Sequence, residues 1–154
     1  RNFKKNISGA TKAGIKVGLY FFTQAVNEAE AVEEASMAMS LASGYKVTYP
    51  IFIDTESASN GRANGLSKSA RTAVVKAFCQ TVRNGGYKAG VYASKSWYAN
   101  QLNASALNGY CIWVAQYNSS CTYSGKYDMW QYSSKGSVSG IKGNVDMNIS
   151  YTGY

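Results

Sequence analysis

Hydrophobic residues in this 154-residue chain fall into two kinds of stretch, short apolar runs and longer amphipathic segments. The apolar runs have the length of strands, whereas apolar residues three or four positions apart indicate helices. The predicted strands cover residues 16–23, 49–57, 87–93, 111–117, 128–133 and 144–149. The predicted helices cover residues 3–13, 27–43 and 67–83, followed by a short helix that begins at Ser94 or Ser96.

Helices and strands alternate at first, and three strands with little helix between them complete the chain. Such alternation predicts parallel strands joined by right-handed crossovers. We therefore predict an α/β fold, a (β/α)8-like TIM-type barrel that is irregular and helix-poor in its last third. A single domain is expected over residues 1–154. Only six strands are predicted, whereas a closed barrel of this class needs eight.

The helix at 27–43 has a recognisable start. Asn27 and Glu30 have the spacing of a capping box, with Asn in place of Ser or Thr. Four glutamates lie in its first turns, where the helix dipole favours negative charge, so we assign them no chemistry. Its inner face is predicted to consist of Ala29, Val32, Ala35, Met39 and Leu41.

Two carboxylates, Asp54 and Glu56, follow the apolar run Ile51–Ile53 with one residue between them. Residues i and i+2 of a strand point to the same face, with Cα atoms about 6.5 Å apart. The carboxyl ends of parallel strands are where active sites form in such folds. We therefore expect both side chains to face one cavity and to perturb each other's pKa. The alternative is that Asp54 caps the following turn and that Glu56 is only solvated.

The composition narrows the possible chemistry. Histidine is absent, which excludes Ser-His-Asp and Cys-His catalysis and most zinc sites. We predict no metal site and no cofactor, and the chain has no phosphate-binding P-loop. General acid–base chemistry is left to a tyrosine or to one of four acids outside the glutamate-rich helix. These acids are Asp54, Glu56, Asp128 and Asp146.

The net charge of +8 favours polyanionic partners, such as nucleic acid, anionic lipid or a bacterial wall. The basic residues are scattered singly, so we predict no specific nucleic-acid binding. No run of about 18 apolar residues occurs, so no membrane span is predicted. The first residues do not have the pattern of a signal peptide. We therefore expect either a mature protein or a sequence whose true N-terminal start is missing.

The three cysteines relate to whether the protein works in an oxidising or a reducing environment. Cys111 and Cys121 flank the strand at 111–117, and an extracellular setting would favour a disulfide between them. The spacing leaves this pairing open. Cys79 lies within a predicted helix and is expected to act as a small buried hydrophobe.

The predicted strand ends should bring acids, aromatic residues and amides to one mouth. The expected members are Tyr20, Asp54, Glu56, Tyr92, Trp113, Gln116 or Tyr117, Trp130, Gln131 and Asp146. Paired carboxylates ringed by aromatic residues fit glycoside hydrolysis. Glu56, with its pKa raised by burial and by Asp54, would hold the proton, while Asp54 would stay ionised.

Several segments carry a resemblance to a known family. They are GLYFFT, PIFIDTE, GVYAS, IWVAQY and MWQYSSKGSVSGIKGNVDMN, and they run nearly from end to end. The chain resembles the family 25 glycoside hydrolases, lysozymes that act as N-acetylmuramidases. The resemblance implies a secreted enzyme that cleaves the β-1,4 bond between N-acetylmuramic acid and N-acetylglucosamine in peptidoglycan.

The resemblance also implies roles for individual residues. Glu56 would be the catalytic acid and Asp54 its partner, which would position the substrate's own N-acetyl group as nucleophile. A direct enzymatic nucleophile is the alternative, and both stay open. The implied substrate-binding residues are Tyr20, Tyr92, Trp113, Tyr117, Trp130, Gln131 and Asp146.

One departure from the family pattern shapes what we expect of the molecule. Members of the family open with a D-x-S-x-x-Q-G motif, and this chain has none. We expect a barrel that lacks its first two strands, roughly 50 residues by typical βα-unit lengths. Exposed sheet edges would then favour a domain-swapped or otherwise associated assembly, and the alternative is a gapped barrel with low activity. The alternative function is a wall carbohydrate-binding remnant with little or no catalysis.

Overall fold

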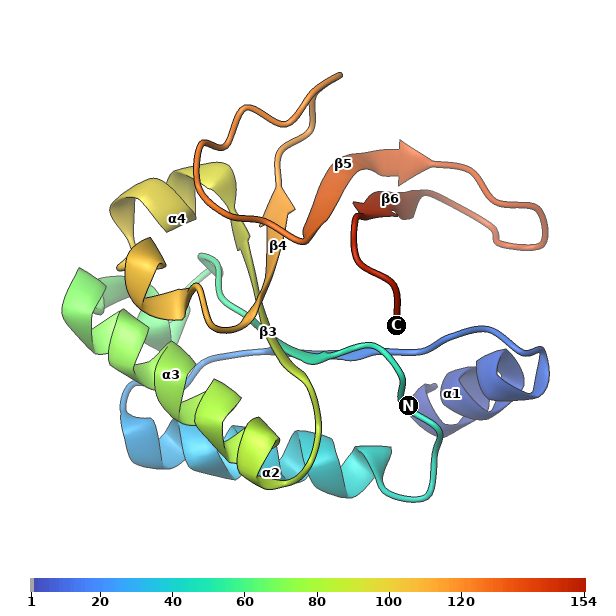
Figure 1. Cartoon of the computed structure of the whole chain (residues 1–154), viewed down its shortest axis with the longest axis horizontal. Coiled ribbons are helices and arrows are strands. Elements are labelled where there is room, and N and C mark those ends of the chain that lie inside the picture. Colours follow the sequence, from blue (N-terminus) through green and yellow to red (C-terminus); the bar gives the residue numbers. More distant parts are fainter. Residues whose placement is uncertain (1) are drawn as a thin grey trace.

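The structure, a computed structural model, describes residues 2–154 and contains one six-stranded sheet with helices on one side (Figure 1). The helices are α1 (Phe3–Lys12), α2 (Glu28–Ala42), α3 (Lys68–Asn84) and α4 (Lys95–Asn100), with 3-10 turns η1 (Arg62–Gly65) and η2 (Ala104–Leu107). The strands are β1 (Leu19–Phe22), β2 (Ile51–Asp54), β3 (Ala89–Ser94), β4 (Cys111–Ala115), β5 (Met129–Gly136) and β6 (Val145–Ser150). The predicted helices and strands are thus confirmed, although β1 to β4 are shorter and β5 is longer than expected.

The strands lie side by side in chain order. β1 to β5 are all parallel, as the alternation predicted, and β6 runs antiparallel to β5. The segment between β5 and β6 is too short for a crossover, so it closes a hairpin instead. Figure 1 shows this hairpin projecting to the side away from α2, α3 and α4.

The sheet is open, as expected of a barrel that lacks two strands, and a complete TIM-type barrel is not formed by the described residues. Among the described residues β1 pairs only with β2, and β6 pairs only with β5. The count of six strands is confirmed, but six strands curl into part of a barrel and do not close it. Each end of the sheet therefore carries an unpaired edge.

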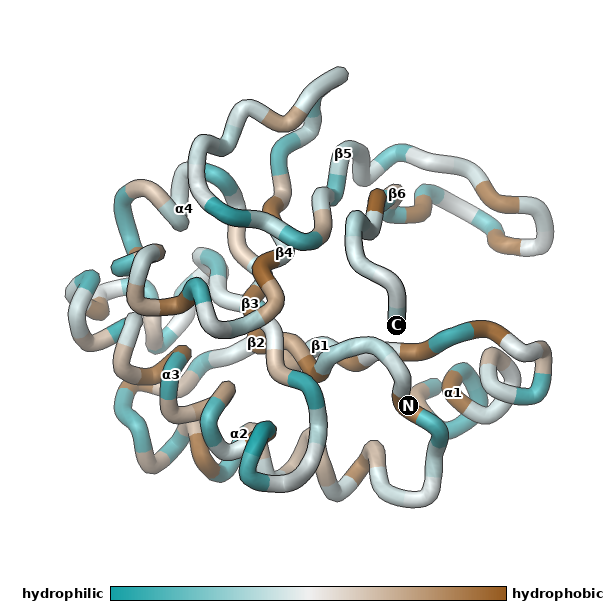
Figure 2. The backbone as a smooth tube through the Cα atoms, viewed as in Figure 1, coloured by the Kyte–Doolittle hydropathy of each residue, from teal (hydrophilic) through white to brown (hydrophobic). Residues whose placement is uncertain are grey.

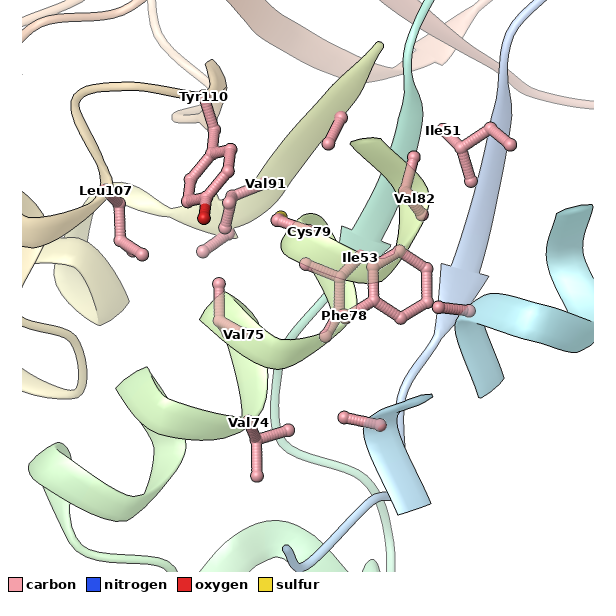
Figure 3. Close-up of a cluster of buried hydrophobic side chains, with 14 of the residues drawn as sticks. Ile51, Ile53, Val74, Val75, Phe78, Cys79, Val82, Val91, Leu107 and Tyr110 are labelled. Atoms are coloured by element: carbon pink, nitrogen blue, oxygen red, sulfur yellow. The ribbon is translucent and has the colours of Figure 1, made fainter. Parts of the chain in front are cut away.

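One face of the sheet makes the hydrophobic core. Side chains alternate along each strand, so Ile51 and Ile53 of β2 point to the same side, and Val91 of β3 lies beside Ile53. Figure 3 shows these side chains facing Val75 and Phe78 of α3. Hydropathy along the backbone follows this layering, with apolar segments concentrated in the strands (Figure 2). Alternation leaves the opposite face for Phe52 and Asp54.

The predicted helix starts are confirmed by hydrogen bonds. The Glu30 N–H donates to Asn27 Oδ1 at 2.9 Å, and the Ala70 N–H donates to Ser67 Oγ at 3.2 Å. Of the two candidate starts for α4, Ser94 is the cap, because its Oγ accepts from the Trp97 N–H.

The predicted inner face of α2 is wrong in part. Ala29 is exposed, and Val32 and Leu41 are 42% and 43% exposed. The residues buried on this helix are all alanines, Ala31, Ala35, Ala38 and Ala42. Their spacing of four and three residues makes one row along the helix, and their small side chains let α2 approach α3 closely.

The structure settles two further points. All three cysteines are free thiols: Cys111 Sγ accepts a hydrogen bond from Tyr154 Oη at 3.0 Å, and Cys79 is fully buried as predicted. Among residues 2–154, no helix combines the length and hydrophobicity that crossing a bilayer requires.

Candidate active site

A cavity of about 220 Å³ opens at the carboxyl ends of the strands, on the sheet face opposite the core. Eight of the nine residues predicted for the site line it. They are Tyr20, Asp54, Glu56, Tyr92, Trp113, Tyr117, Gln131 and Asp146. The ninth, Trp130, lies elsewhere.

Strand register explains why these residues meet. Asp54 lies beside Tyr92 on the next strand, and Tyr92 lies beside Trp113 on the one after. Neighbouring residues in a parallel sheet point to the same face, so these three side chains form a row across β2, β3 and β4. Gln131 and its neighbour Asn148 continue this face on β5 and β6.

Trp130 corrects the expectation that it lines the groove. It is registered with Val114, whose side chain belongs to the core, and only 6% of its surface is exposed. Its indole N–H donates to the Gln116 carbonyl at 2.9 Å. Because Trp130 and Gln131 are consecutive on one strand, they face opposite sides, and Gln131 alone reaches the cavity.

Hydrogen bonds hold the aromatic wall in place. The hydroxyls of Tyr92 and Tyr117 both donate to Gln131 Oε1, at 2.7 and 3.0 Å. The Trp113 indole N–H donates to Asn148 Oδ1 at 2.9 Å. The Trp113 ring also packs edge-on against Tyr92, with centroids 4.7 Å apart. The wall is therefore a connected unit that spans β3 to β6.

Phe52 supports this wall from below. Its ring is buried and lies 5.1 Å, centroid to centroid, from that of Trp113. It rests against Gly90, where an added Cβ would overlap the Phe52 ring and come 3.0 Å from the Cys111 carbonyl oxygen. Glycine is therefore needed at position 90 because the phenyl ring occupies the space of a side chain.

Asp54 is the most perturbed acid of the site. It is 7% exposed, and its Oδ1 is buried without a hydrogen-bond partner among residues 2–154. Burial, and secondarily the charge of Glu56, raises the pKa of Asp54 from 3.8 to about 7. This differs from the expectation that Asp54 stays fully ionised, because the sheet face around it is drier than the sequence indicated.

Glu56 stands at the exposed rim of the cavity. Partial burial raises the pKa of Glu56, and the neighbouring Asp146 carboxylate raises it further. The direction agrees with the sequence prediction, but the second cause is Asp146 rather than Asp54. The cavity thus gathers three acids, of which two, Asp54 and Glu56, have a raised pKa.

Comparison with known proteins places the chain in a family. The model of "Glycosyl hydrolases family 25" matches residues 1–141. The chain belongs to glycosyl hydrolase family 25.

Similar proteins of known name support this. The family-25 chain is 29% identical over 147 residues to an autolytic lysozyme of Clostridium acetobutylicum, which is 95% of this chain and 43% of that protein. A family 25 glycosyl hydrolase from Bacillus anthracis superposes with a TM-score of 0.82 at 25% identity, over 99% of this chain and 72% of that one.

The modular autolysin LytC from Streptococcus pneumoniae gives a TM-score of 0.83 at 26% identity. The match covers 96% of this chain and 37% of LytC, and LytC has also been solved with a synthetic peptidoglycan ligand. The family-25 chain therefore spans less than half the length of LytC and of the clostridial lysozyme.

Three residues of this family-25 site escaped the sequence prediction. Asn148 lies inside the NVDMN segment, two positions after Asp146, so the alternation of a strand could have indicated it. Phe52 and Gly90 carried no such signal. Their role depends on two strands lying side by side, which the pattern along either strand does not reveal.

Proposed function

We propose that this chain hydrolyses peptidoglycan at the β-1,4 bond between N-acetylmuramic acid and N-acetylglucosamine. The observation that carries the proposal is the pair Asp54 and Glu56 in an aromatic cavity of a family 25 chain. The names of its relatives, an autolytic lysozyme and an autolysin solved with a peptidoglycan ligand, support the substrate class. We propose an extracellular, cell-wall location on the same grounds.

In this proposal Glu56 is the general acid. Its position on the rim gives a sugar chain access, and its raised pKa favours the protonated form that must donate. The proton passes to the glycosidic oxygen as the bond to the anomeric carbon breaks. The positive charge that develops on the sugar is then stabilised by the remaining carboxylates.

Asp54 assists this step. Its Oδ1 has no hydrogen-bond partner among residues 2–154 and is available to accept a hydrogen bond from the substrate. An acetamido N–H is a suitable donor, and this bond would orient the acetamido oxygen toward the anomeric carbon as an internal nucleophile. The alternative, in which a carboxylate of the enzyme is itself the nucleophile, uses the same residues.

The aromatic wall binds the glycan strand. Trp113 and Tyr92 offer apolar ring surfaces beside the acids, and the Tyr117 side chain extends the wall into solvent. Buried Gln131 fixes both tyrosine hydroxyls. Tyr20 and Asp146 complete the rim on the β1 and β6 sides.

Conversion of Glu56 to Gln tests the proposal. We expect Glu56→Gln to lower the release of reducing ends from purified peptidoglycan by at least about 100-fold, the contribution typical of a general acid. The matched control is Glu33→Gln on the exposed surface of α2, which should retain the wild-type rate. Equal rates for Glu56→Gln and Glu33→Gln would contradict the assignment of the acid.

A second candidate is binding to the wall without turnover. It is favoured by the openness of the site on the β1 side, where Tyr20 is 67% exposed. Co-sedimentation with wall fragments, measured beside the release of reducing ends, separates the two functions. Sedimentation without any hydrolysis by the wild-type chain would support binding alone, and would overturn the hydrolase proposal for this chain.

A further inference from the structure

The end of the sheet opposite the candidate active site carries a second hollow surface. Two cavities of about 300 and about 280 Å³ open there, and both are lined by Thr48. The lining residues used in the argument below lie just before β1, β2 and β3 or at the chain end. We call this surface the amino-end groove. Its defining residues are Lys16, Lys46, Thr48, Tyr87, Lys88 and Tyr154.

The groove is positively charged. Lys16, Lys46 and Lys88 are exposed, and none of them lies in either of the ion pairs found within residues 2–154. Neither cavity has an acid in its lining. Asp128, a carboxyl close enough to act on Tyr154, is already held by Lys126 at 3.4 Å and by the Ile112 N–H. The three ammonium groups are therefore available to an anion.

Aromatic packing positions one of these charges. The Lys88 ammonium lies 4.5 Å from the ring centroid of Tyr154, and Tyr49 packs on the same ring at 4.7 Å. Figure 1 shows the chain end beside the segment that leads into β2. A cation–π contact restrains the lysine while leaving its N–H groups free to bind.

Thr48 adds a polar group that the protein does not use. Its hydroxyl is buried, and no hydrogen-bond partner for it exists in the described part of the chain. An unsatisfied buried hydroxyl costs stability, so such groups call for an explanation. Because Thr48 lines both cavities, a ligand oxygen bound against this residue would satisfy its hydroxyl.

We infer that the amino-end groove binds a phosphodiester-linked polyol or sugar polymer, of the kind that accompanies peptidoglycan in cell walls. Three exposed lysines suit a polymer that carries several phosphates, and the Thr48 hydroxyl suits a phosphate or polyol oxygen. Single-stranded nucleic acid is disfavoured because base stacking needs free aromatic faces. Here both Lys88 and Tyr49 already occupy the ring of Tyr154. Only the choice of a wall polymer rests on the proposed function.

The test measures binding of purified poly(glycerol phosphate) to the intact chain. Lys16→Gln/Lys46→Gln/Lys88→Gln should weaken binding at least about tenfold and reduce the slope of log K against log salt by about 2. The control variant, Lys5→Gln/Lys76→Gln/Lys135→Gln, removes the same charge from exposed positions outside the groove and should change binding by less than about threefold. If both variants lost the same amount of affinity, the effect would be due to net charge alone, and the proposed site would be overturned.

Two further measurements sharpen the test. Thr48→Val removes the hydroxyl without changing charge, and should weaken binding by about threefold or more while leaving thermal stability unchanged or higher. Unchanged affinity would overturn the role of this hydroxyl. An oligothymidylate of equal charge should bind the wild-type chain more weakly than poly(glycerol phosphate) does. The choice of polymer would be overturned if the two ligands bound the wild-type chain with equal affinity and the triple-lysine groove variant weakened both to the same extent. Because the probe contains no glycosidic bond in its backbone, its binding is read independently of hydrolysis by Glu56.

Discussion

At the scale of the residue, Asp54, the proposed partner of the general acid, carries a cost to stability. Between pH 3.8, its ordinary pKa, and about 7, its pKa in the fold, the folded state holds more protons than the unfolded one. The free energy of unfolding contributed by this group therefore falls as the pH rises through that window, and the loss is complete above it. The difference between the two pKa values sets an upper limit of roughly 4 kcal/mol.

Asp54→Asn is accordingly expected to be more stable than the wild type at about pH 8, by roughly 1–3 kcal/mol, and equally stable at about pH 3. The measurement is urea unfolding at both pH values, followed by circular dichroism. Glu33→Gln, on the exposed face of α2, should show no such pH-dependent gain. A loss of stability for Asp54→Asn at the higher pH would show that the buried carboxylate is stabilised rather than strained.

At the scale of the element, the site depends on how closely β2 and β3 pack. Gly90→Ala would force the Phe52 ring away from its place beneath Trp113. We expect a loss of about 1–3 kcal/mol in stability, as for other overpacked cores, and a change in tryptophan fluorescence. Gly9→Ala in α1 is the matched control, since its Cβ would meet nothing within 4 Å and should stabilise the helix slightly. Wild-type stability in Gly90→Ala would contradict the tight contact.

At the scale of the whole molecule, the unpaired edge at β1 predicts self-association. Phe22 and Tyr20 on this strand are exposed aromatic residues beside free backbone groups. Sedimentation velocity should show oligomers whose fraction rises with concentration, and Phe22→Lys should reduce them. Met37→Lys on α2 makes the same change at an exposed site away from the edge and should have little effect. A chain that stays monomeric at every concentration would contradict this prediction.

Sequence by itself determined the elements, their order and the residues near the active cavity. The patterns that predict these elements lie within short segments of the chain. Alternation along a strand places Asp54 on the face opposite Ile53, and short apolar runs between turn residues mark each strand. The capping residues Asn27, Ser67 and Ser94 could be found for the same reason, because each bonds within its own first turn.

Only the tertiary structure decided which aromatic residues face the cavity and which carboxyl is most perturbed. Trp130 turns toward the core because its strand is registered on β4, and Asp54 has a raised pKa because neighbouring strands exclude water from it. Burial and strand pairing sum contributions from segments far apart in the chain. The pattern of residues within one segment does not show which other segments will pack against it. These features could therefore not be predicted before the positions of all the strands were known.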